Sequence, residues 1–116
     1  MKVIYIASPY AGDVKNNIEF AKHACQYVIT TGNAFFCPHL LYSQILNDNN
    51  EEDRKLGLDM GKRLLLKCDE LWAFGNRISQ GMFEEIEFAR QNDIPVKRIQ
   101  SMDMAQEENK LCMEMR

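Results

Sequence analysis

The chain has 116 residues, enough for one compact domain and too few for two. Hydrophobic residues make up 46% and charged residues 27%, the balance of a folded globular protein rather than of a disordered tail. The formal net charge of -3 argues against a partner that is a nucleic-acid polymer, since proteins that grip such a backbone carry a basic face. Small anionic ligands stay compatible with this charge, because a helix N-terminus binds phosphate without any Lys or Arg.

Membrane anchors and metal centres find no support in the sequence. No apolar run approaches the ~20 residues of a membrane span, and the N-terminal apolar run is too short for a signal peptide. The four cysteines form no CxxC pair, so we expect free thiols in a reducing compartment. Neither a P-loop nor a dinucleotide fingerprint is present. We therefore expect a soluble, cytoplasmic protein with no metal, no cofactor and no membrane partner.

The first third of the chain predicts a strand followed by a helix. Residues 2–7 form an apolar run ended by Ser8-Pro9, which is typical of a buried strand. A helix follows, capped by Asn16 or Asn17, running to about Thr31 and ended by Gly32. Its expected buried face consists of apolar residues at helical spacing, namely Ile18, Ala21, Cys25, Val28 and Ile29.

Strands and helices continue to alternate through the rest of the chain. On the predicted helix over 51–66, the buried side is expected to carry Leu56, Met60 and Leu64. No repeat or linker interrupts the sequence, so we expect one domain over 1–100 and a C-terminal helical extension over 101–116. The further predicted elements are a strand over 34–37, a helical turn within 40–46, a helix over 51–66, a strand over 70–74, a helix over 80–92, a strand over 95–99 and a Met-rich helix over 102–115.

This order of elements predicts an α/β fold built on a parallel sheet, with helices on both faces. The right-handed crossover rule favours a small three-layer Rossmann- or flavodoxin-like arrangement. Such sheets bind ligands beyond the carboxyl ends of their strands, where the strand order reverses. The candidate site therefore includes residues 8–12, Pro38-His39, and the stretch from Gly75 into the helix over 80–92.

Of the three glutamates on the helix over 80–92, only Glu85 is aimed at the apolar seam. With about 100° per residue, Glu84 and Glu87 point away from the face that carries the apolar residues. A carboxylate at such a seam costs free energy to bury unless it is paired or functional. The alternative is a glutamate at the edge of the seam that reaches back to solvent or to an arginine.

Three further positions could contact a ligand. Ser79-Gln80-Gly81 opens a helix directly after a strand, and its free N–H groups predict a site for an anion or a hydroxyl. The alternative for Ser79 is a plain N-cap. Tyr10 and His39 lie in loops just past the first two strands, where surface packing and a structural histidine are the alternatives.

Together these residues resemble the nucleoside 2-deoxyribosyltransferase-like family, including its short bacterial and phage members. The matching segments are VIYIASPYAGD, CPHLL and CDELWAFGNRISQGMFEEIEFARQNDIPV, which span residues 3–96 in the family's order. The last segment is the most specific. It places Gly81, Glu85 and Ala89 at the family's glycine, glutamate and alanine.

The resemblance implies a flavodoxin-like sheet and cleavage or transfer at the N-glycosidic bond of a (deoxy)nucleoside or nucleoside 5′-monophosphate. In that family the glutamate attacks C1′ of the sugar, a role that passes to Glu85, and an aspartate before the third strand protonates the leaving base. Asp59 is the nearest equivalent, although its spacing to Asp69 differs from that of the longer transferases. The resemblance also implies a homo-oligomer whose neighbouring subunits complete each site. Its implied substrate contacts are Ser8, Pro9, Tyr10, His39, Ser79 and Gly81.

The sequence departs from the longer transferases at Ser79, where they carry a sugar-binding aspartate. Family members that hydrolyse nucleoside 5′-monophosphates carry serine there, in contact with the phosphate. The loop SPYAGD, by contrast, keeps Tyr10 and is closer to the transferases. Transfer and hydrolysis thus both stay open, as does a non-catalytic nucleotide-binding protein that uses the same pocket. A structural or assembly role rests only on the Met-rich tail.

Overall fold

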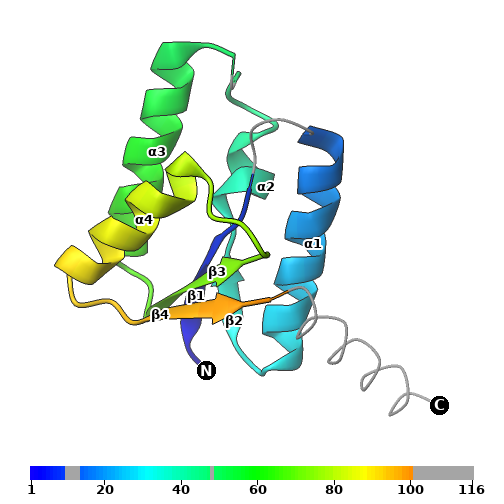
Figure 1. The fold of residues 1–116 in the computed structure, drawn as a ribbon, viewed down its shortest axis with the longest axis vertical. Helices are drawn as coiled ribbons and strands as arrows, with labels where there is room; N and C mark the ends of the chain where they lie inside the picture. Colours follow the sequence, from blue (N-terminus) through cyan, green and yellow to red (C-terminus); the bar gives the residue numbers. More distant parts are fainter. Residues whose placement is uncertain (10–13, 48, 101–116) are drawn as a thin grey trace.

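Strands and helices alternate along the part of the chain that the computed structural model describes, residues 1–9, 14–47 and 49–100 (Figure 1). The predicted helix over 102–115 lies outside the described residues. In chain order the elements are β1 (Val3–Ala7), α1 (Val14–Thr30), β2 (Ala34–Phe36), α2 (Pro38–Tyr42), α3 (Glu51–Leu65), β3 (Glu70–Phe74), α4 (Gln80–Gln91) and β4 (Val96–Ile99).

The four strands form one parallel sheet in the order β2-β1-β3-β4. β1 pairs with β2 on one side and with β3 on the other, so the strand order reverses between β1 and β3. Figure 1 shows α1 on one face of the sheet and α3 and α4 on the other. The predicted three-layer α/β fold is therefore confirmed, and its crevice opens where β1 and β3 end.

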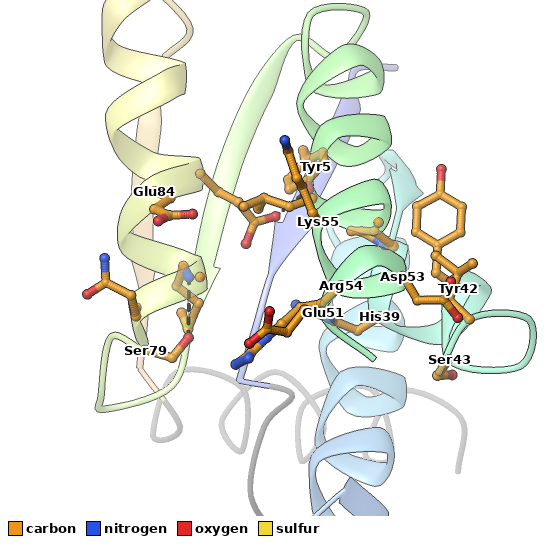
Figure 2. Close-up of a pocket in the computed structure, with 18 residues that line it drawn as sticks. Tyr5, His39, Tyr42, Ser43, Glu51, Asp53, Arg54, Lys55, Ser79 and Glu84 are labelled. Atoms are coloured by element: carbon orange, nitrogen blue, oxygen red, sulfur yellow. Dashed lines mark hydrogen bonds between the residues drawn. The ribbon is translucent and has the colours of Figure 1, made fainter. Parts of the chain in front are cut away.

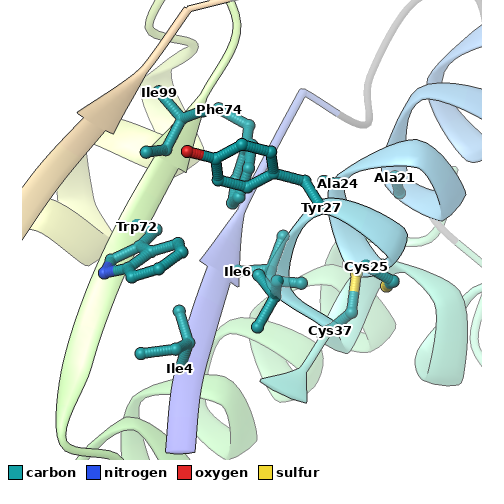
Figure 3. Packing of buried hydrophobic residues seen from close by; sticks show 11 residues of the cluster. Ile4, Ile6, Ala21, Ala24, Cys25, Tyr27, Cys37, Trp72, Phe74 and Ile99 are labelled. Atoms are coloured by element: carbon teal, nitrogen blue, oxygen red, sulfur yellow. The ribbon is translucent and has the colours of Figure 1, made fainter. Parts of the chain in front are cut away.

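Alternation along β1 divides the core into two clusters, one on each face of the sheet. Ile4 and Ile6 point toward α1 and pack with Tyr27 and Phe74 (Figure 3). Tyr5 and Ala7 point to the opposite face, where α3 and α4 cover them. Each large side chain buried in these clusters contributes about 1.5–3 kcal/mol to folding. The same alternation sends one polar group, the Tyr5 hydroxyl, into the cluster beneath α3 and α4.

The first helix ends as predicted but differs from its prediction at its start and in its buried face. It starts at Val14, so Asn16 and Asn17 lie inside α1 and do not cap it. Ile29, expected on the buried face, is 59% exposed. Ala24 and Tyr27 are buried instead, since Ala24 lies three residues after Ala21 and four before Val28, and Tyr27 lies three residues after Ala24.

The expected buried side of α3 is also wrong. Leu56 and Leu64 are 49% and 37% exposed, whereas Gly61 and Leu65 are buried. The small glycine allows α3 to approach the sheet on a face that a hydrophobicity pattern does not reveal. α2 starts at Pro38, earlier than predicted, because a proline at the first helical position lacks only an N–H that would be unpaired there. None of the helices in residues 14–47 and 49–100 combines the length and apolar character that a membrane crossing requires.

Glycines 32 and 75 end α1 and β3 with positive φ angles of 83° and 102°. We expect Gly32→Ala and Gly75→Ala each to lower the unfolding free energy by about 1 kcal/mol or more, because L side chains avoid this backbone conformation. The two losses should be similar, because a Cβ at Gly75 would only reach ordinary van der Waals distance, 3.4 Å, from the Phe20 ring, and at Gly32 no described residue lies within 4 Å. Urea denaturation measures both. A clearly larger loss at Gly75 would show that the Phe20 ring cannot accept the added Cβ.

Candidate active site

A pocket of about 510 Å³ lies among β1, α2, α3 and α4, within the range of small-molecule sites. Tyr5 and Glu85 line its inner part, and His39 and Tyr42 line it from α2. Figure 2 shows Ser79 and Glu84 on α4 across the pocket from Glu51, Arg54 and Lys55 on α3.

Glu85 is the buried carboxylate of this pocket, with 3% of the residue exposed. α4 presses Met82, Ile86 and Ala89 against the sheet, and Glu85 shares that side of the helix. Burial raises the pKa of Glu85 to about 7, since the charged form loses its water. A hydrogen bond from Tyr5 opposes that rise, the nearby charge of Glu84 adds to it, and Lys62 opposes it.

The Tyr5 hydroxyl donates a hydrogen bond to Oε2 of Glu85, from 80 positions earlier in the chain. Burial, followed by the negative charge of Glu85, raises the pKa of Tyr5 well above its usual value, so the phenol keeps its proton and remains a donor. Sequence reasoning missed Tyr5. A usable signal was its place in a buried strand, on the opposite face from Ile4 and Ile6, because a buried tyrosine hydroxyl needs a partner.

Ser79 caps α4 at the mouth of the pocket. Its Oγ accepts a hydrogen bond of 3.2 Å from the Met82 N–H, which leaves the hydroxyl proton available for another acceptor. Gly81 also lines the pocket, and a Cβ at that position would have no atom of the described residues within 4 Å. α4 carries no acidic residue in its first turn, so no side chain there offsets the positive end of the helix dipole.

The remaining predicted site residues lie in different places. His39 is half-buried and lines the pocket. Ser8 is fully buried, and its hydroxyl has no hydrogen-bond partner within the described structure. Among the described residues that line the pocket, neither Ser8 nor Pro9 occurs, and Asp59 is exposed and absent from them. Tyr10 lies outside the described residues.

Two charged residues of α4 that the helical wheel grouped together have different surroundings. Glu87 faces solvent and pairs with Arg90 at 3.2 Å. Glu84 is half-buried and lines the pocket, since it lies near the N-terminal end of α4 that borders the cavity. Sequence reasoning also missed Arg54 and Lys55, because a surface helix gives no signal of which of its charges will face a cavity.

A family model described as "Domain of unknown function (DUF7768)" matches residues 2–99 of the chain. No curated protein matches this chain.

Solved structures of other proteins share the fold. A 2-deoxyribosyltransferase from the psychrotolerant bacterium Bacillus psychrosaccharolyticus superimposes with a TM-score of 0.68 at 18% identity, over 84% of this chain and 72% of that one. A conserved protein from Enterococcus faecalis V583 gives 0.60 at 22% identity, over 84% and 62%. A 2-desoxiribosyltransferase from Leishmania mexicana gives 0.57 at 17% identity, over 87% and 65%. This chain therefore spans less than two thirds of the latter two.

The raised pKa of Glu85 makes the stability of the fold depend on pH. The unfolded chain releases this proton near the ordinary glutamate pKa of 4.5, while in the folded protein the pKa of Glu85 is about 7. The unfolded state thus binds fewer protons between these values, and the unfolding free energy falls by roughly 3 kcal/mol as the pH rises from 4.5 to 7.

We expect Glu85→Gln to remove most of this fall, because the amide carries no charge and can still accept from Tyr5. The variant should be more stable than the wild type at pH 8 and similar to it at pH 5, as measured by chemical denaturation. Glu87→Gln, which changes a half-buried surface carboxylate paired with Arg90, is the control and should not alter the pH dependence. A wild type whose stability is flat from pH 5 to 8 would contradict the buried, proton-holding state of Glu85.

Proposed function

The chain belongs to the DUF7768 family, and we propose that it cleaves or transfers the N-glycosidic bond of a (deoxy)nucleoside or nucleoside 5′-monophosphate, with Glu85 as the nucleophile. The observation that carries this proposal is the buried Glu85 carboxylate, which borders a pocket and accepts a hydrogen bond from Tyr5. The fold shared with two 2-deoxyribosyltransferases supports it. A buried carboxylate with a perturbed pKa and a specific hydrogen-bond partner beside a cavity is a physical mark of a functional site.

The proposed reaction has two steps. Oxocarbenium character develops at C1′ as the bond to the base nitrogen breaks, and the electron pair of that bond leaves with the base. The ionised Glu85 carboxylate stabilises the developing positive charge and then forms a C1′–O ester bond. Water or a second base attacks C1′ and breaks the C1′–O ester bond, which releases the Glu85 carboxylate and gives hydrolysis or transfer. The attacking molecule passes its proton to the group that had protonated the leaving base. The pKa of about 7 leaves a substantial fraction of Glu85 ionised near neutral pH, as a nucleophile requires.

The leaving base also needs a proton, and Asp59 does not line the pocket. The half-buried carboxyl groups of Asp53 and Glu84 do line it, and we assign proton delivery to this pair. The position of Asp59 is also the observation that favours the alternative function, a non-catalytic protein that binds nucleotides in this pocket. Binding without turnover of any nucleoside or 5′-monophosphate would establish that alternative.

We also propose that the protein is a cytoplasmic homo-oligomer that acts on a small nucleoside or nucleotide. This fits its resemblance to the deoxyribosyltransferases. Light scattering of the purified chain determines its oligomeric state.

Replacing Glu85 with Ala should lower kcat by about a thousandfold or more, because loss of a nucleophile removes the covalent step. Glu87→Ala is the matched control, since Glu87 lies on the same helix and pairs with Arg90 at the surface. Base release from a panel of deoxynucleosides and deoxynucleoside 5′-monophosphates, with and without a second free base, measures both variants. Equal turnover by the two would refute the assignment of Glu85, and circular dichroism confirms that both fold.

A phosphate group on the substrate is proposed to bind at Ser79. The hydroxyl proton of Ser79 and the N-terminus of α4 are available to an anion, and Arg54 lines the pocket from α3. A serine there also lacks the negative charge of the aspartate that the longer transferases carry. The charge-assisted contact should contribute about 1.5–3 kcal/mol.

We therefore expect a nucleoside 5′-monophosphate to bind roughly ten- to a hundredfold more tightly than its nucleoside, and Ser79→Asp to reverse that order by like-charge repulsion. Aspartate is itself a good N-cap, so α4 should remain intact. Calorimetric titration of both ligands into both proteins is the measurement. Tighter binding of the free nucleoside to the wild type would favour the plain transferase, with Ser79 acting only as a cap.

A further inference from the structure

The hydrogen bond between Tyr5 and Glu85 forms in a space bordered by α3. Gly61 of α3 is buried against this pair, and a Cβ added to it would lie 2.8 Å from the Tyr5 Oη and 3.9 Å from Cζ. Real Cβ atoms do not come within 3.0 Å of another heavy atom, so an alanine would have to displace the hydroxyl. It would leave the rest of the ring in ordinary contact.

The phenol ring has little room to accommodate such a displacement. Tyr5 is 1% exposed, and its ring packs against Phe36 with the centroids 5.8 Å apart. Its hydroxyl is the end of a rigid ring rather than of a flexible chain, and it donates a hydrogen bond to Glu85. A side chain on Gly61 would therefore act on the hydrogen bond before it acted on anything else.

Helix propensity alone disfavours glycine inside α3, where alanine is the better residue. Gly57, one turn earlier, is a useful comparison. Among the described residues, a Cβ there would meet only Cδ1 of Leu46, at 3.3 Å, the end of a flexible side chain that can move. The two glycines thus share a helix and differ in what opposes them: a leucine methyl group at Gly57, and the hydroxyl bound to Glu85 at Gly61.

We propose that Gly61 is a positioning residue for the site: its missing side chain keeps open the space in which the Tyr5 hydroxyl reaches the Glu85 carboxylate. The kinetic consequence rests on the proposed function, because a misplaced hydroxyl impairs Glu85 as a nucleophile. The steric and electrostatic consequences do not depend on the proposed function. Groups that act on Glu85 are Tyr5 from β1, Lys62 from α3, Glu84 from α4 and the thiol of Cys37, next to α2.

The test is a double-mutant cycle on Gly61→Ala and Tyr5→Phe in the full chain. It measures the titration of Glu85 by NMR of 13C-labelled glutamate carboxyl groups, together with the melting temperature. Gly61→Ala should raise the pKa of Glu85, because the hydrogen bond that lowers it is lost, and should lower the melting temperature. In the Tyr5→Phe background, which has no Oη to displace, Gly61→Ala should leave the titration unchanged and raise the melting temperature through helix propensity.

Gly57→Ala controls for the change in helix propensity, and its effects should be the same in both Tyr5 backgrounds. Coupling of Gly57→Ala to Tyr5 as strong as that of Gly61→Ala would overturn the proposal, since the effect would then belong to α3 as a whole. An unchanged Glu85 titration in the single Gly61→Ala variant would also overturn it.

The same variants and the wild type also test folding and turnover. Where Gly61→Ala alone does not fold, the double variant should fold, and failure of both to fold would overturn the positioning role. A wild type without turnover would refute the proposed function, while the titration and melting data would still decide the role of Gly61.

Discussion

The hydrogen bond from Tyr5 to Glu85 in a water-poor interior is the interaction on which the site depends. It joins the central part of β1 to α4, and so connects the sheet to the helix that borders the pocket. Burial favours the protonated carboxyl and the hydrogen bond favours the ionised one, so the group titrates near neutrality. A carboxylate in water would titrate too low to show this balance, and one buried without a donor would titrate higher.

The packing of the parallel sheet excludes water from Glu85, and the balance between burial and hydrogen bonding requires this. The sheet is covered on both faces, and the face that carries Tyr5 also receives Met82, Ile86 and Ala89 of α4, which exclude water around Glu85. The opposite face is packed by α1, and the contacts around Ile4 and Ile6 are made mainly by apolar and aromatic side chains. The polar pair is thereby confined to one layer, and Glu85 is the buried charged residue of the described part of the chain. The free-energy cost of burying the carboxyl is offset by the packing of the whole domain.

The pocket combines two kinds of surroundings along its length. Its inner part holds the protected carboxyl, whereas its mouth carries the start of α4 and the charged side chains of Glu51, Arg54 and Lys55. A ligand with a reactive, weakly polar centre and an anionic end would match both parts. This distribution of charge is why a nucleotide is favoured over an uncharged metabolite as the substrate class of the proposed enzyme.

The sequence by itself determined the alternation of strands and helices, the parallel sheet, the turns at Gly32 and Gly75, and the inward direction of Glu85 on its helix. These features follow from local rules: the period of apolar residues, the preference of glycine for positive φ, and the geometry of one helical turn. Only the tertiary structure decided that Tyr5 meets Glu85, that Gly61 faces their contact, that Ile29, Leu56 and Leu64 are exposed, and that Asp59 lies away from the pocket. The physical reason is that each of these depends on how closely and at what rotation a helix crosses a strand distant in sequence, and no local pattern encodes that distance.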